Sequence, residues 1–294
     1  IKAHTIAVVA MEEKNFEGKS IIWRELEVLD MPLILIDGGY FVGRFENHWS
    51  RYSKKKNMRY WWNKGKERHI TKDELMANLK RILSYDIGYL NMRIQEMMFP
   101  RKVVVCYDGI YGRRTRGSRY PDYKMNRRGD IKSDKHKGID VRNRIKQCGF
   151  DPHNIQEYWS YEYDELMEAD DIIARICFDC PTDDEIIVMT KDKDLFQLMV
   201  LPNIKIHDFT KFYTVDDFKE EFGIEPHQYL DLKALAGDSS DNIPGVKGIG
   251  LKTASKLLQK YGTIEEIPYD IIGEDKREEI NLWKRISKIP YHIT

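Results

Sequence analysis

The chain lacks an excess of charge of either sign, has few cysteines and contains no long apolar run. Its 294 residues include 48 Lys and Arg, 48 Asp and Glu, and only four Cys. Four cysteines cannot form a disulfide framework in a chain of this size. Without a long apolar run, a transmembrane helix or a signal peptide is not predicted. We therefore expect a soluble, cytoplasmic protein that does not bind a membrane.

Two of the cysteines, Cys177 and Cys180, form a CxxC pair. No second Cys or His pair at zinc-finger spacing accompanies them. Both fall where a helical pattern places small apolar residues. Core cysteines are therefore the preferred interpretation, and a metal or redox site is the alternative.

The charges are balanced in total but unevenly distributed. Residues 109–147 contain thirteen Lys and Arg against four Asp, and residues 51–68 contain eight against one Glu. The acidic residues gather instead at the ends of apolar runs and in the second half of the chain. Acidic clusters beside basic stretches are typical of proteins that hold a polyanion over metal ions.

Three short apolar runs, residues 33–37, 103–108 and 186–192, each lead into an aspartate. Such runs, followed by segments of helix length, predict buried parallel strands. The remaining pattern predicts a helix over 72–97, an edge strand near 155–163, a helical run over 172–178 and a short strand and hairpin over 204–213, with helices from about residue 215 onward. The fold class is α/β, with a mostly parallel central sheet and flanking helices.

The carboxyl ends of parallel strands meet at one edge of a sheet, so the acidic residues there should converge. The candidate metal ligands are Asp37, Asp108, Glu168, Asp170, Asp171, Asp192, Asp194, Asp238 and Asp241. Helix capping explains a single Asp at a helix start, but one start needs only one cap. Two or three acids at one start instead favour a two-ion site, for which oxygen-rich ligands select Mg²⁺ or Mn²⁺.

A basic segment from Arg113 to Arg128 directly follows the second of these strands. A solvated charged surface is the ordinary explanation of such a run. Its position above the sheet edge, and its interleaved Tyr120 and Tyr123, also fit the binding of single-stranded nucleic acid. In a helix, Lys124 and Arg127 would share a face and could contact a scissile phosphate.

A second motif, Gly245-Val-Lys-Gly-Ile-Gly250, is followed by Lys252 and Thr253. It lacks the spacing and the preceding strand of a dinucleotide-binding fingerprint. A tight turn between two helices is the simplest structure for it. Such a turn can also present backbone amides to a phosphate and carbonyl oxygens to a cation.

The stretch from Gly237 to Ala254 resembles the helix–three-turn–helix motif of the 5′-nuclease (flap endonuclease) superfamily. The resemblance is greatest to bacteriophage 5′-nucleases and to the 5′-nuclease domain of bacterial DNA polymerase I. Further motifs match in the same order: Leu35-Ile-Asp37-Gly, Tyr107-Asp108-Gly, Tyr123-Lys-Met-Asn-Arg127, Glu168-Ala-Asp-Asp171 and Thr190-Lys-Asp-Lys-Asp194. The resemblance covers roughly residues 33–265.

The resemblance implies a PIN-like nuclease core, a helical arch over residues 109–147 and a helix–three-turn–helix subdomain. It implies two Mg²⁺ or Mn²⁺ ions, with Asp37, Asp108, Glu168 and Asp170 at the first, Asp171 close by, and Asp192, Asp194, Asp238 and Asp241 at the second. A K⁺ ion would lie on the helix–three-turn–helix. Lys124, Arg127 and Tyr123 would be catalytic. Candidate DNA contacts are Arg44, Arg116, Lys233, Gly245, Lys247, Gly248, Gly250, Lys252 and Thr253.

We therefore expect a monomeric structure-specific 5′-nuclease that cleaves 5′-flap or 5′-ended DNA, or RNA paired with DNA, in replication or repair. A 5′-3′ exonuclease that removes primers and a catalytically inactive binder of branched DNA are the alternatives. We expect three parts: an extension over 1–32, the nuclease core over 33–214 and a helical part over 215–294. Asp37 is followed by two glycines, which excludes a dehalogenase-like phosphatase, and the Gly237–Ala254 motif disfavours a compact PIN ribonuclease.

Overall fold

The computed structural model describes residues 31–39, 92–95, 98, 100–109, 111–126, 159–181 and 184–291. The predictions for most of the 1–32 extension, for most of the 72–97 helix and for the second half of the 109–147 arch lie outside these residues. No helix in the described ranges has both the length and the apolar character needed to cross a membrane.

A six-stranded sheet with the order β3-β2-β1-β4-β5-β6 forms the core of the described part. Its first five strands are parallel, and β6 runs antiparallel to β5. The strands are β1 (Leu33–Asp37), β2 (Lys102–Tyr107), β3 (Trp159–Tyr163), β4 (Ile186–Met189), β5 (Ile204–His207) and β6 (Phe212–Tyr213). The predicted fold class, the edge strand and the hairpin after residue 204 are confirmed.

Both faces of the sheet are covered, which explains why its strands are apolar almost throughout. Leu35 and Val104 lie on one face, in a core that includes residues of helix α6 (Ala169–Asp179). Ile34 and Ile36 lie on the opposite face, where Ile94 and Met98 pack against them. Cys177 of α6 is a free thiol in the first core, as predicted, while Cys180 is partly buried.

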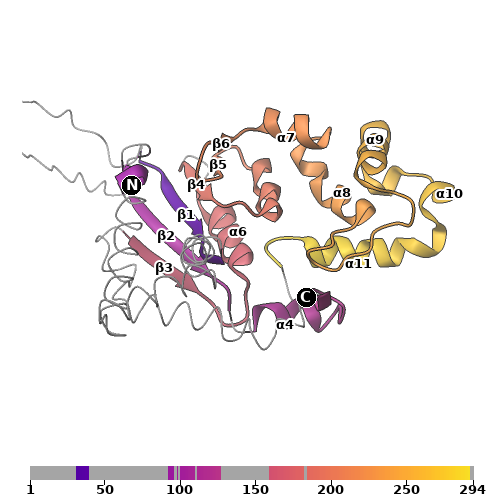
Figure 1. The fold of residues 1–294 in the computed structure, drawn as a ribbon, viewed down its shortest axis with the longest axis horizontal. Helices are drawn as coiled ribbons and strands as arrows, with labels where there is room; N and C mark the ends of the chain where they lie inside the picture. The colour runs from indigo at the N-terminus through magenta and orange to yellow at the C-terminus, as the bar shows by residue number, and fades with distance from the viewer. Residues whose placement is uncertain are drawn as a thin grey trace, which may run out of the picture.

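Helical elements lie between the strands in sequence, and from residue 215 onward the described chain is helical. Figure 1 shows the sheet towards one end of the molecule and these helices towards the other, with α6 lying against the sheet. The helical elements are α4 (Gly112–Gly117), η4 (Lys193–Val200), α7 (Val215–Phe222), η5 (Pro226–Gln228), α8 (Tyr229–Ala236), α9 (Leu251–Tyr261), η6 (Ile264–Glu266), α10 (Tyr269–Ile272), η7 (Glu274–Lys276) and α11 (Arg277–Ser287). Helix α8 packs between α9 and α11.

The register of the sheet brings the acidic strand ends together. Asp37 at the end of β1 pairs with Cys106 of β2, and Ile36 pairs with Met189 of β4. Asp108 therefore follows β2 at the same edge at which residues 190–194 follow β4. Helix α6 also begins at this edge, because Ala169 N donates a hydrogen bond to Asp108 Oδ1 at 2.8 Å.

Candidate metal and nucleic-acid site

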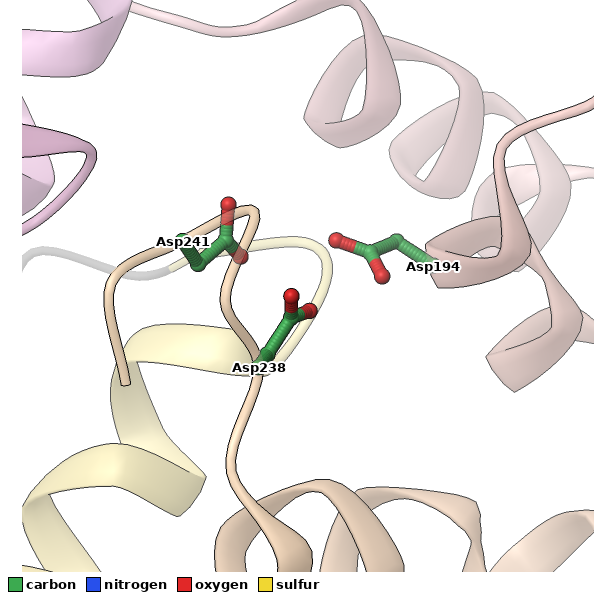
Figure 2. A group of neighbouring side chains, drawn as sticks. All are labelled: Asp194, Asp238 and Asp241. Atoms are coloured by element: carbon green, nitrogen blue, oxygen red, sulfur yellow. The ribbon is translucent and has the colours of Figure 1, made fainter. Parts of the chain in front are cut away.

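Three aspartates from two separate elements converge in a single cluster. Asp194 lies in the first turn of η4, whereas Asp238 and Asp241 lie in the loop between α8 and α9. One carboxylate oxygen from each lies within 4.8 Å of the others. Figure 2 shows the three side chains pointing towards one another across the gap between loop and helix. Carboxylate oxygens at this spacing suit a hard divalent cation.

Asp170, in the first turn of α6, connects this cluster to the sheet edge. Its removal from water raises its pKa well above the ordinary value, and the negative charges of Asp192, Asp37 and Asp194 raise it further. Asp37 is held in place because its Oδ1 accepts from Gly39 N at 2.9 Å and its Oδ2 from Thr190 Oγ1 at 3.1 Å. Asp37 and Asp170 thus share one electrostatic environment with Asp192 and Asp194, and the roles of these acids as metal ligands stay predictions.

Lys233 of α8 lies inside the aspartate cluster. Its Nζ donates to Asp194 Oδ1 and lies 2.8 Å from Asp238 Oδ2 and 3.9 Å from Asp241 Oδ2. Although burial opposes ionisation of Asp238, the Lys233 charge lowers the pKa of that carboxyl to about 2. The Lys233 side chain is only 6% exposed. In this structure Lys233 therefore neutralises the cluster, and its contact with DNA stays a prediction.

Lys124 reaches the same region from the basic segment. Its Nζ lies 2.8 Å from Glu168 Oε1 and 3.6 Å from Asp241 Oδ1. Burial works against the charge on Lys124, but Glu168 and neighbouring groups raise its pKa well above the ordinary value. In return, and against the effect of burial, Lys124 and Arg116 lower the pKa of Glu168 to about 2. These acids therefore favour the protonated form of Lys124.

Arg116 of α4 was predicted to contact DNA, and this prediction is wrong for the structure. Its side chain is 3% exposed, and its Nη1 lies 2.6 Å from both Glu168 Oε2 and Asp171 Oδ2. Its Nη2 donates to Asp171 Oδ1 at 2.6 Å, and its Nε donates to Ile286 O at 3.0 Å. A guanidinium held by two carboxylates and a carbonyl has no face left for a phosphate.

Asp171 and Tyr123 likewise support Glu168 instead of facing a ligand. Both Asp171 oxygens bind Arg116, and Oδ1 also accepts from Tyr291 N at 2.8 Å, which ties the end of the described chain to α6. The Tyr123 hydroxyl donates to Glu168 Oε2 at 2.8 Å. Tyr123 is 5% exposed, so the expectation that its ring stacks on a base is wrong.

Helix capping is the alternative explanation for the acidic residues. In several of them, one carboxylate oxygen does accept a hydrogen bond from a backbone N–H at a helix start. Asp108 Oδ1 accepts from Ala169 N, and Asp192 Oδ1 accepts from Asp194 N at 2.9 Å. Glu168 and Asp171 form a reciprocal capping box at the start of α6. Capping does not account for Asp170, Asp238 and Asp241, which share their environment with other carboxylates.

In the glycine-rich turn over residues 237–250, two backbone segments pass close to each other. Gly237 and Gly245 have φ of 80° and 69°, and a side chain on Gly245 would meet the Gly237 nitrogen at 2.4 Å. Val246 and Ile249 anchor the turn in the core. Between and after these anchors, the exposed residues are Lys247, Gly248, Gly250, Leu251, Lys252 and Thr253. The DNA contacts predicted for Lys247, Gly248, Gly250, Lys252, Thr253 and Gly245 remain predictions. The DNA contact of Arg44 and the catalytic role of Arg127 also remain predictions, because both residues lie outside the described residues.

Two residues that organise the site, Thr190 and Asn242, were not predicted to be functional. Thr190 Oγ1 donates to Asp37 and accepts from Asp192 N at 2.9 Å, so one hydroxyl links two strand ends. A threonine two residues before an aspartate at a strand end is the signal that could have indicated this turn. Asn242 belongs to the Gly237–Ala254 motif but was given no role of its own. Its φ is 60°, a backbone conformation that asparagine tolerates better than most residues.

Comparison with known proteins identifies the family. Residues 84–223 match the family model described as "5′-3′ exonuclease, N-terminal resolvase-like domain". Residues 224–289 match the model described as "5′-3′ exonuclease, C-terminal SAM fold". The chain belongs to the 5′-3′ exonuclease family. The resemblance inferred from the motifs is thus confirmed.

Individual relatives agree with this assignment. The chain is 36% identical over 212 residues to DNA polymerase I of Caldicellulosiruptor bescii, an alignment covering 68% of this chain and 24% of that protein. It is 36% identical over 184 residues to a 5′-3′ exonuclease of Bacillus subtilis, covering 58% of this chain and 56% of the relative. The chain therefore spans about a quarter to about half of the length of these curated relatives.

Solved structures share the fold. A bacteriophage T5 flap endonuclease, solved as a pseudo-enzyme-product complex with DNA and metal ions, superposes with a TM-score of 0.61 at 18% identity, covering 88% of this chain and 89% of the other. A T5 5′-exonuclease with bound zinc gives a TM-score of 0.59 at 20% identity, covering 88% and 90%. These likenesses establish the arrangement of the sheet and the helical part.

Proposed function

We propose that this member of the 5′-3′ exonuclease family is a metal-dependent 5′-nuclease that hydrolyses phosphodiester bonds in 5′-flap or 5′-ended DNA. The observation that carries the proposal is the meeting of strand-end acids with Asp238 and Asp241 around Lys124 and Lys233. A catalytically inactive binder of DNA would gain nothing from concentrating so many carboxylates. Membership of the family and the polymerase I relatives add support for a role in DNA replication or repair.

The carboxylates fit divalent cations of the Mg²⁺ or Mn²⁺ type. Asp194, Asp238 and Asp241 supply hard oxygen ligands within reach of one ion, and Lys124 and Lys233 compensate part of their negative charge. Asp37, Asp108, Glu168 and Asp170 would hold another ion at the sheet edge, and Asp192 would join the ion at Asp194. When bound, such ions make a bound water acidic and stabilise charge on a phosphate. Divalent metals in the T5 structures support this assignment.

Lys124 would supply positive charge to the scissile phosphate. Its ammonium already lies between Glu168 and Asp241, and a phosphate brought to these acids by metal ions would meet it there. Because its pKa is raised, it stays protonated and stabilises developing negative charge without taking a proton. Arg127, three residues later, is proposed to contact the same phosphate. Tyr123 and Arg116 would act indirectly, by fixing Glu168.

The exposed turn and the start of α9 would bind the duplex. Lys247 and Lys252 are exposed there, and the amides at a helix start favour phosphate. A K⁺ ion on the turn carbonyls, RNA–DNA hybrids as substrates and a monomeric state belong to the same proposal. The DNA complex of the T5 flap endonuclease supports DNA as the partner. The division into a core over 33–214 and a helical part from 215 also stays a prediction.

The proposal is tested by cleavage of a 5′-labelled flap duplex beside a nicked duplex, each with Mg²⁺, with Ca²⁺ and with EDTA. Mg²⁺-dependent products at the flap junction are the expected result. Short products from the nick alone would instead make the protein chiefly a 5′-3′ exonuclease of the primer-removing type. Tight binding without any cut in Mg²⁺ or Mn²⁺ would refute catalysis and leave a DNA-binding protein.

A further inference from the structure

The segment that carries Lys124 is hydrogen-bonded to the loop that carries Asp238 and Asp241. Lys124 N donates to Asp241 O at 2.9 Å. The Tyr120 hydroxyl donates to Asn242 O at 3.1 Å, and Asn242 Nδ2 donates back to Asp122 O at 2.9 Å. Asn126 Nδ2 also donates to Ser239 O. Donors from both sides thus join residues 120–126, here called the lysine segment, to residues 238–242, here called the aspartate loop.

Lys124 has a backbone conformation that it would not adopt by itself. Its φ is 52°, in the left-handed region that disfavours residues with a Cβ. Such a conformation persists only where the surroundings determine it. Here Lys124 N is bound to Asp241 O, and Lys124 O accepts from Arg113 Nη2. The position of the Lys124 ammonium therefore depends on the aspartate loop and not only on its own segment.

The aspartate loop is in turn fixed to the turn proposed to bind duplex. Asp238 N and Ile243 O, and Ile243 N and Asp238 O, are joined by hydrogen bonds of 2.8 Å that close the loop. The crossing of Gly237 and Gly245 follows immediately, and Val246 enters the core. Asn242 thus lies between this turn and the lysine segment, with its side chain directed to the latter.

We propose that Asn242 is a positioning residue, whose side-chain amide and left-handed backbone hold the lysine segment so that Lys124 stays between Glu168 and Asp241. This inference rests on the proposed nuclease function, and it adds a residue to it. Asn242 touches none of the reacting groups, and it acts through Asp122 and the backbone of Lys124. The loop that provides two carboxylates would also set the position of the catalytic cation.

A simpler role is that asparagine only permits the left-handed turn at position 242. Asn242→Gly separates the two roles, because glycine adopts the same backbone without strain but has no amide to donate to Asp122. If the turn alone matters, the glycine variant is fully active. If the amide positions Lys124, kcat should fall about 3- to 10-fold, the effect of losing one hydrogen bond, with KM unchanged.

The test measures kcat and KM on the flap duplex for the wild type and Asn242→Gly, each with and without Lys124→Ala. We expect no further loss from Asn242→Gly when Lys124 is absent, because the asparagine acts through the lysine. An equal loss in both backgrounds would overturn the proposal. Asn203→Gly is the matched control, because its amide binds Pro181 O and Asp184 O before β5, away from the site; it should keep wild-type kcat.

A second readout does not depend on nuclease activity. In the metal-free protein, the acetylation rate of Lys124 by acetic anhydride is followed by peptide mass spectrometry, with exposed Lys276 as internal reference. Asn242→Gly should raise the Lys124 rate about 3- to 10-fold, the same hydrogen-bond factor. An unchanged rate would overturn the inference, even if the wild type cleaved no substrate. Should Asn242→Gly fail to fold, Asn242→Asp, which tolerates the left-handed backbone but has no amide to donate to Asp122 O, decides by the same measurements.

Discussion

Replacement of Lys233 by methionine tests whether the aspartate cluster is a site that requires positive charge. The ammonium is bound to Asp194 and Asp238, whose side chains are 18% and 16% exposed. Methionine keeps the length of the side chain but leaves these carboxylates close together without a cation. Breaking a buried ion pair in this way costs about 3–5 kcal/mol. The metal-free variant should therefore be less stable than the wild type by that amount.

The assay is urea unfolding of both proteins in EDTA, in Mg²⁺ and in Mn²⁺. A loss of this size lowers the midpoint by about 1–2.5 M urea for a slope of about 2–3 kcal/mol per M. A cation bound at a hundred times its Kd restores about 2.7 kcal/mol. We expect the gain from metal to be larger in Lys233→Met than in the wild type, where the ammonium competes for the same oxygens.

Lys284→Met is the matched control. Lys284 of α11 binds Asp231 and Glu265, at a distance from the cluster. Its loss should lower the midpoint without creating any additional response to metal. The reasoning would be refuted if Lys233→Met were as stable as the wild type in EDTA, or if metal stabilised Lys233→Met and Lys284→Met equally.

Further predictions concern catalysis, DNA binding and acid stability. Lys124→Ala should lower kcat on a flap duplex about 10²-fold or more with little change in KM, whereas a pure rise in KM would make Lys124 a binding residue. Lys247→Ala and Lys252→Ala should each reduce the salt slope of duplex affinity by about 1, and unchanged slopes would place the duplex elsewhere. In urea unfolding, the metal-free protein should lose stability as the pH falls from 4 to 2. The lowered pKa of Glu168 stabilises the fold fully only above the unfolded value of 4.5, and this contribution, at most about 3 kcal/mol, disappears towards pH 2. Constant stability over that range would contradict the ion pairs.

The sheet and the convergence of its acids could be predicted from sequence because both follow from short-range rules. Apolar runs that end in aspartate specify parallel strands, and parallel strands place their ends at one edge. Asp37 and Asp108 fall there for this reason. Asp238 and Asp241 could be assigned because the motif of the α8–α9 loop has a highly specific residue spacing.

The roles of the basic residues could not be predicted, because charge alone does not say which partner a cation meets. Arg116 and Lys233 look like DNA contacts in a list of residues, and both are buried on carboxylates of the same chain. Arg116 meets Asp171 at a separation of 55 residues, and Lys233 meets Asp194 at a separation of 39. The burial of Tyr123 could not be predicted for the same reason, because it depends on α6 and not on the neighbours of Tyr123 in sequence.

The most direct test of the central claim compares the wild type with Asp194→Asn and Asp238→Asn on one 5′-labelled flap duplex. Each substitution removes a carboxylate charge from the cluster while leaving the exposed basic turn intact. The account predicts Mg²⁺-dependent cutting at the junction by the wild type, a loss of about 10²-fold or more in both variants, and unchanged duplex affinity in Ca²⁺. Wild-type rates in either variant, or cutting by the wild type in EDTA, would contradict a metal-dependent site at these residues.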